Sequence, residues 1–191
     1  MLTDKIPRKA TLKDEYRRSD ELRTIALPAL ESLRPQALIM ERALAEENKK
    51  DLQAAANRIA TTVASSFAVA VPGVRVLGVR PQEVTETSVT ELFGDYDPET
   101  AKIRLWMRTA VLRKPTSFGT FLSTLCHELC HHLDVAHFDL PETYHTRGFY
   151  ERAGLLYHHI RATPPRRLVW KEQNNGTYRI DWPETMRGSA K

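Results

Sequence analysis

The sequence has few cysteines, no long apolar run and no apolar segment near its start. Its only cysteines, Cys126 and Cys130, are too few for the disulfide framework of a secreted domain. The least polar stretch, residues 60–79, is interrupted by Pro72 and Gly73 among other residues, so it cannot cross a bilayer. We therefore expect a cytoplasmic protein with neither a signal peptide nor a membrane segment.

The sequence also has no large excess of charge of either sign. The 28 Lys and Arg residues against 24 Asp and Glu give a net charge of +4, less than dedicated nucleic-acid binders carry. Residues 161–191 hold seven basic and three acidic side chains, which accounts for the whole surplus. Because Trp170, Tyr178 and Trp182 are interleaved with these charges, a weak contact between this tail and nucleic acid is one prediction.

Helix-forming residues dominate the first third of the chain. Residues 11–66 are predicted to form two or three helices, with breaks at Pro28 and Pro35. The last of these helices has an apolar stripe at three- and four-residue steps, formed by Leu52, Ala55, Ala56, Ile59, Val63 and Phe67. We expect this stripe to face the core.

The middle of the chain contains strand signals. Residues 74–80 are β-branched and bounded by prolines, which favours a strand. Residues 89–93 and 102–107 flank a turn-rich connector, residues 94–100, and are predicted to pair as an antiparallel hairpin.

Two helices and a second hairpin are predicted after these strands. One helix follows a cap at Thr116 or Ser117, and the other runs from about residue 146 to 161. The second hairpin is expected around Asn174-Asn175-Gly176, with strands at 168–170 and 177–182. The pattern predicts an α+β protein in which a small antiparallel sheet packs on the first of these two helices.

The segment His127-Glu128-Leu129-Cys130-His131 matches the pattern H-E-x-x-H and lies on a predicted amphipathic helix. Residues four apart on a helix lie within roughly 40° of each other, so both imidazoles project from one side and can bind one zinc ion (Zn2+). In hydrolases with this motif the metal activates a water molecule and the glutamate accepts its proton. Glu128 is therefore the expected general base.

A third protein ligand is expected, and two histidines are candidates. His137 completes the spacing H-E-x-x-H-x-x-D-x-x-H, but Asp134 stands where the metzincin pattern has glycine. On a continued helix, His137 would point about 80° or more away from the first two histidines. His145 opens the next predicted helix, where Phe149 can pack beneath it, so we favour His145.

The combination of these segments resembles the SprT-like zinc metallopeptidases and their small gluzincin-type relatives. The resemblance spans roughly residues 54–160 and rests on Gly94-Asp-Tyr-Asp-Pro-Glu-Thr-Ala-Lys-Ile-Arg-Leu, Leu125-Cys-His-Glu-Leu-Cys-His and His145-x-x-x-Phe149. It implies zinc ligands His127, His131 and His145, Glu128 as base, and a strand lining the substrate cleft. The four-cysteine zinc ribbon of many family members is not found in this sequence.

The resemblance implies a zincin-like core within an α+β chain. We expect an N-terminal helical extension (1–50), a metallopeptidase domain (51–162) and a basic β-hairpin tail (163–191). The expected function is zinc-dependent hydrolysis of peptide bonds in a protein or peptide substrate. The alternative is a non-hydrolytic zinc scaffold that binds nucleic acid or a protein partner through the basic hairpin.

Other polar residues near the motif have less specific interpretations. Asp134 is either an outer-shell carboxylate for a histidine ligand or a solvated residue at the helix end. His132 points about 100° away from His131 and is expected to be a surface or capping residue. Cys126 and Cys130 are expected to pack as small apolar residues.

Overall fold

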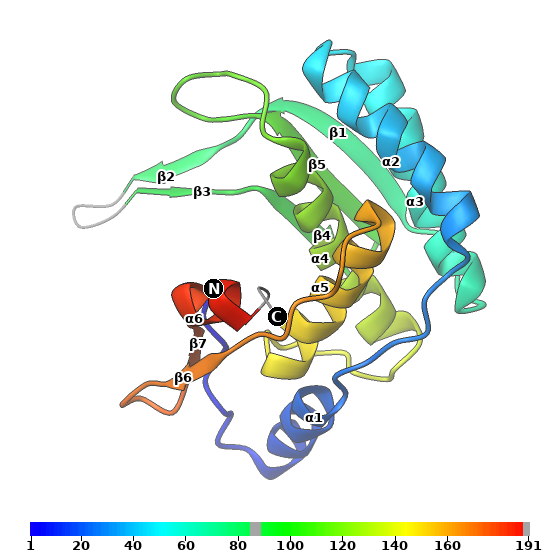
Figure 1. Cartoon of the computed structure of the whole chain (residues 1–191). Coiled ribbons are helices and arrows are strands. Elements are labelled where there is room, and N and C mark those ends of the chain that lie inside the picture. Colours follow the sequence, from blue (N-terminus) through cyan, green and yellow to red (C-terminus); the bar gives the residue numbers. More distant parts are fainter. Residues whose placement is uncertain (85–88, 189–191) are drawn as a thin grey trace.

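The computed structural model describes residues 1–84 and 89–188 and shows helices gathered around a small sheet (Figure 1). In chain order the elements are α1 (Ala10–Glu21), α2 (Leu30–Ala45), α3 (Lys49–Ser66), β1 (Gly73–Val79), β2 (Gln82–Val84), β3 (Val89–Glu91), β4 (Gly94–Asp97), β5 (Lys102–Arg108), α4 (Phe118–Ala136), α5 (Arg147–Arg161), β6 (Trp170–Glu172), β7 (Tyr178–Ile180) and α6 (Trp182–Arg187). This composition confirms the α+β class. Among the described helices, none has the length and apolar character needed to cross a membrane.

The N-terminal region contains three helices, as the sequence predicts. The break expected at Pro28 falls between α1 and α2. Pro35 lies inside α2, so the break predicted there is wrong. The buried face of α2, with Leu33, Ala37 and Met40, packs into the core. The free energy gained by this burial offsets the loss of the backbone hydrogen bond that proline cannot donate.

The core lies between the sheet and its helices. α3 packs on β1, α4 packs on β4 and β5, and α2 and α5 pack onto these two helices. The predicted stripe of α3 is buried throughout, which confirms its orientation. The sheet contributes Val74, Val76, Ile103, Leu105 and Met107 to this core, α3 contributes Leu52, Ile59 and Val63, α4 contributes Phe121, Leu122, Leu125 and Leu129, and α5 contributes Leu156 and Ile160.

The sheet beside α4 is mixed rather than antiparallel. Its order is β1-β5-β4, with β4 antiparallel to β5 and β1 parallel to β5. The chain leaves the sheet after β1 to form the separate ribbon of β2 and β3, and returns as β4 on the far side of β5. The chain reverses direction twice between β1 and β5, once from β2 to β3 and once from β4 to β5, so β1 runs parallel to β5.

The hairpin predicted from residues 89–93 and 102–107 is wrong in its first strand. Residues 89–91 pair with β2 instead. The antiparallel partner of β5 is β4, which lies in the predicted connector. Only the second half of the connector turns, because the Asp97 carboxylate accepts hydrogen bonds from the backbone N–H of Glu99 and Thr100. A Cβ at Gly94 would lie 2.5 Å from Thr124, so glycine lets β4 approach α4 closely.

The C-terminal hairpin forms around Asn174-Asn175-Gly176 as predicted, but its first strand, β6, begins at Trp170, where the predicted strand 168–170 ends, and its second strand, β7, is shorter than 177–182. The chain then continues into α6. Residues 189–191 of the predicted tail lie outside the described residues. The first residues of the chain lie along β7: the Thr3 N–H donates to the Tyr178 carbonyl, and Leu2 bridges to Arg179. The N-terminal segment and the hairpin are therefore joined beside α5 (Figure 1).

Candidate metal centre

α4 presents the two histidines of the H-E-x-x-H motif on one side. The helix begins at Phe118 because the Ser117 side chain accepts a hydrogen bond from the Thr120 backbone N–H, which confirms the predicted cap. One turn separates His127 from His131, and their Nε2 atoms are 3.1 Å apart. The local helix geometry expected from the sequence is therefore present.

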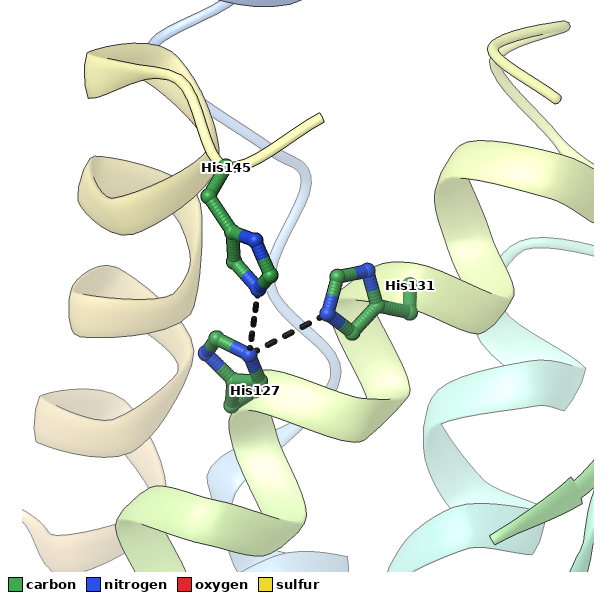
Figure 2. Close-up of side chains that lie close together, drawn as sticks. All are labelled: His127, His131 and His145. Carbon is green, nitrogen blue, oxygen red and sulfur yellow. Dashed lines mark hydrogen bonds between the residues drawn. The ribbon is translucent and has the colours of Figure 1, made fainter. Parts of the chain in front are cut away.

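His145 lies with these two residues. It directly precedes α5, where the Thr146 side chain caps the helix by accepting from the Phe149 N–H. Its Nε2 is 3.0 Å from Nε2 of His127, and Figure 2 shows the three imidazoles pointing toward one another. Within the part of the chain that the structure describes, this is the one cluster of three or more His, Cys, Asp or Glu side chains able to hold a metal ion.

Two of the three separations between the ring nitrogens are close to those found around a small metal ion. Their ligand atoms lie within 4.8 Å of one another. Nitrogens bound at about 2.0–2.1 Å around a tetrahedral ion are about 3.3 Å apart, close to the separations of 3.0 and 3.1 Å found here. Nε2 of His127 faces both other rings, but it carries at most one hydrogen and can donate only one hydrogen bond. A shared cation therefore satisfies the three ring nitrogens better than hydrogen bonds do.

The outer ring nitrogen of His131 contacts a buried polar network. Its Nδ1 lies 2.7 Å from Oγ1 of Thr143, whose hydroxyl donates to the Asp134 carboxylate over 3.4 Å. Since that hydroxyl donates to Asp134, it accepts a hydrogen bond from the Nδ1–H of His131, which leaves the Nε2 lone pair of His131 free for a metal. Asp134 also pairs with the fully buried Arg152 at 2.6 Å.

His145 contacts the start of the chain instead. Its backbone N–H donates to Oδ2 of Asp4 at 2.8 Å, and its Nδ1 lies 3.4 Å from the same oxygen. The Asp4 backbone N–H in turn donates to the His145 carbonyl at 2.9 Å. Hydrogen bonding to His145 lowers the pKa of Asp4, against the opposing effect of burial.

Burial keeps the two α4 imidazoles neutral. Desolvation lowers the pKa of His127 to about 3, with a smaller contribution from His145. Desolvation and both neighbouring histidines lower the pKa of His131 to about 2. Neutral imidazole is the form that binds a metal, so these rings need not lose a proton at neutral pH.

Phe149 forms the floor of the cluster. Its fully buried ring lies 4.8 Å from His127, 4.4 Å from His131 and 5.2 Å from His145, measured between ring centroids. This confirms the expected packing beneath His145. Tyr150 stacks on the outer face of His145, and its hydroxyl donates to the Leu2 carbonyl.

Glu128 lies on the side of α4 that faces β4. It is 5% exposed, and burial together with the nearby Asp95 raises its pKa to about 8. Within the described residues its carboxyl group has no hydrogen-bond partner. It is therefore a buried acid one position after His127 in the sequence.

His137 does not join the cluster. It is the C-cap of α4, and its ring packs on Phe67 and Phe138 at 5.0 and 4.8 Å. The helix runs to Ala136 without the break at Asp134 that the metzincin-like spacing would need. Of the two candidate third histidines, the structure brings His145 to the other two.

Two further sequence predictions have clear outcomes. His132 is 2% exposed, so its predicted surface position is wrong: its ring contacts the Tyr96 hydroxyl and the Ala70 carbonyl. Cys126 and Cys130 are buried and unbonded to each other, which confirms that they pack as apolar residues. Burial raises the pKa of both thiols, that of Cys130 to about 12, so they remain protonated.

Asp134 is fully buried, so its predicted alternative as a solvated residue at the helix end is wrong, and within the described residues it makes no direct hydrogen bond with a histidine. It reaches His131 only by way of Thr143, a residue that the sequence did not single out. Thr143 has φ +41°, an unusual conformation for a β-branched residue, and this turn aims its hydroxyl at the cluster. Asp4 was missed as well, because no spacing or periodicity connects position 4 with position 145.

No protein-family model, curated protein or solved structure matches this chain. The resemblance to SprT-like peptidases stays a prediction drawn from its motifs. The centre is consequently defined by its own geometry, as three histidine imidazoles that can hold a metal ion next to a buried carboxyl group.

Proposed function

We propose that this protein is a zinc-dependent metallopeptidase with a zincin-like core, related to the SprT-like group. His127, His131 and His145 would bind the metal, and Glu128 would act as general base. The observation that carries the proposal is the convergence of three imidazole Nε2 atoms from an H-E-x-x-H helix and a downstream histidine. Three histidines leave a fourth tetrahedral position for water or substrate, the arrangement of catalytic rather than structural zinc sites.

A bound zinc ion would supply Lewis acidity, which polarises the scissile carbonyl and lowers the pKa of water. Glu128 would accept the proton of the attacking water and pass it to the leaving amine. Burial raises the pKa of Glu128 to about 8 in the metal-free protein, so its carboxyl group is protonated at neutral pH. A cation bound at the three histidines would lower this pKa and keep Glu128 ionised, the form in which it accepts a proton. The proposed substrate is a protein or peptide in the cytoplasm.

The alternative function, nucleic-acid binding through the C-terminal hairpin, has less support. The Trp170 indole donates to Glu151, and the Arg147 guanidinium lies 4.2 Å above the Tyr178 ring. Two of the three aromatic rings that could stack on bases are thus used inside the protein. Of the three rings, only Trp182 is left exposed beside the basic side chains, so the hydrolytic function is preferred.

Four proteins test the proposal: wild type and the variants Glu128→Gln, His145→Ala and His137→Ala. We expect about one zinc per wild-type chain and hydrolysis of a labelled unfolded protein. Glu128→Gln should keep zinc and lose about 10²–10⁴-fold in rate, because only the base is removed. His145→Ala should lose zinc and activity, whereas His137→Ala should retain both.

Metal analysis and a fluorescence assay of hydrolysis give the two readouts. A wild-type protein without zinc would overturn the metal centre. Zinc-bound wild type without activity, combined with salt-dependent retention of nucleic acid, would favour the alternative function. Zinc loss in His137→Ala but not in His145→Ala would show that His137, and not His145, is the third ligand.

A further inference from the structure

The N-terminal segment surrounds the loop that carries His145. The side chain of Ser19 lies 3.0 Å from that of Thr146, and the Glu15 carboxylate accepts the Glu142 backbone N–H at 2.7 Å. A Cβ on Gly148 would collide with the Ser19 carbonyl, so α1 lies directly against the start of α5. Residues 1–22 therefore help to determine where His145 can be.

Asp4 makes the most direct of these contacts. Its backbone N–H and its carboxylate Oδ2 form two hydrogen bonds with the main chain of His145, at 2.9 and 2.8 Å. The same Oδ2 faces Nδ1 of the His145 ring at 3.4 Å. These contacts join residues 141 positions apart in the chain.

The chemistry of these atoms determines the proton position on His145. An ionised carboxylate can only accept hydrogen bonds, so it favours the proton on Nδ1. The lone pair is then on Nε2, the atom directed at His127. A carboxylate in this position also makes an imidazole a stronger metal ligand and fixes its orientation.

We propose that Asp4 is a positioning residue of the metal centre, which holds His145 in the tautomer and orientation that bind the metal. The inference rests on the metal-binding part of the proposed function and not on peptidase activity. It makes the first residues of the chain part of the metal centre, although they lie far from the motif in sequence.

The contacts of Asp4 itself are held by its neighbours. Thr3 is 3% exposed, and its hydroxyl accepts a hydrogen bond from the Tyr178 N–H at 2.8 Å. The Tyr16 hydroxyl donates to the Asp4 carbonyl at 3.1 Å. Asp4 can therefore be altered in its side chain while the segment stays in place.

The test measures zinc affinity of the full-length chain by competition with a chromophoric chelator. Asp4→Asn can still accept the His145 backbone N–H but has no charge opposite Nδ1, and we expect its zinc affinity to fall about 10–100-fold. Asp4→Ala should lose at least as much. Asp14→Asn, which changes an exposed carboxylate paired with Arg17 on α1, is the matched control and should bind zinc like wild type.

Two further measurements separate positioning from a general structural role. Thr3→Ala loosens the same segment but keeps the Asp4 carboxylate, so its zinc affinity should fall clearly less than that of Asp4→Asn. In the metal-free proteins, ¹⁵N-edited imidazole spectra should show His145 protonated at Nδ1 in wild type and shifted toward the Nε2-protonated form in Asp4→Asn.

Zinc binding by Asp4→Asn as tight as by wild type would overturn the inference, as would an equal loss in Thr3→Ala. An unchanged His145 tautomer in Asp4→Asn would also overturn it. None of these results depends on hydrolysis, so an inactive protein that binds zinc contradicts the proposed function and leaves this test intact.

Discussion

His131 and His145 face the same point from opposite sides, but different kinds of structure hold them. His131 is supported from within the core, through Thr143, by the buried pair of Asp134 and Arg152. His145 is supported near the surface by Asp4, whose side chain is 46% exposed. The first support is built from α4, α5 and the loop between them, and the second from the opposite end of the sequence.

Because of this difference, the supports of His131 contribute to the stability of the fold, whereas the support of His145 contributes little to it. A buried ion pair cannot lose one partner without leaving the other charge desolvated, so the supports of His131 are tied to the folding of the whole chain. A half-exposed carboxylate can be removed at little cost, because water replaces it. Changes at the two supports should therefore affect different measurements.

The largest effect is expected from Asp134→Ala. This change leaves the fully buried Arg152 guanidinium without its carboxylate, and the unfolding free energy should fall by about 3–5 kcal/mol. Urea unfolding of the metal-free protein near neutral pH measures this loss. Asp14→Ala, at an exposed pair, is the control and should change stability by no more than about 0.5 kcal/mol. Equal stability of the two variants would show that the buried support does not contribute to folding.

A comparable effect is expected from Glu128→Gln as the pH changes. In the metal-free protein, burial raises the pKa of Glu128 from 4.5 to about 8, so between these values the folded state holds a proton that the unfolded state has released. Stability contributed by this group is present at low pH and is lost as pH rises toward 8. Glutamine does not titrate, so from about pH 5 to about pH 8 the variant should gain on the order of 3 kcal/mol relative to wild type.

Thermal or urea unfolding in the presence of a chelator, repeated across this pH range, gives the comparison. A constant stability difference between Glu128→Gln and wild type would mean that Glu128 is solvated in the metal-free protein. The side of α4 that faces β4 would then be in contact with water at Glu128, whereas the side that holds His131 is buried.

The smallest effect is expected from Thr143→Val. Valine keeps the branched shape but removes the hydroxyl between His131 and Asp134, so zinc affinity should fall about tenfold. The unfolding free energy should fall by about 1 kcal/mol, the net contribution of a hydrogen bond. Thr143→Ser retains the hydroxyl and is the control. If Thr143→Val lowers zinc affinity no more than Thr143→Ser does, the hydroxyl does not support His131.

Local features of this protein could be predicted because short-range physics determines them. The cap at Ser117, the shared side of His127 and His131, and the packing of Phe149 all depend on helix geometry and nearby residues. The C-terminal hairpin likewise follows from a turn sequence that few other conformations accommodate.

The wrong predictions concern contacts that depend on distant parts of the chain. The strand that pairs with β5 is decided by the turn at Asp97 and the close approach of Gly94 to α4. Pro35 is tolerated in α2 because the helix packs on a core that its own sequence does not contain. His132 is buried because Tyr96 and the Ala70 carbonyl lie opposite it.

The sequence by itself determined the α+β class, the helix that carries H-E-x-x-H and the shared side of His127 and His131, because helical periodicity is a local property. Tertiary structure alone decided the mixed sheet, the choice of His145 over His137 as the histidine that joins the cluster, and the supports at Thr143 and Asp4. Those depend on which surfaces pack together when the chain folds. The free energy that selects such packing comes from the burial of the whole core, and no single segment contains it.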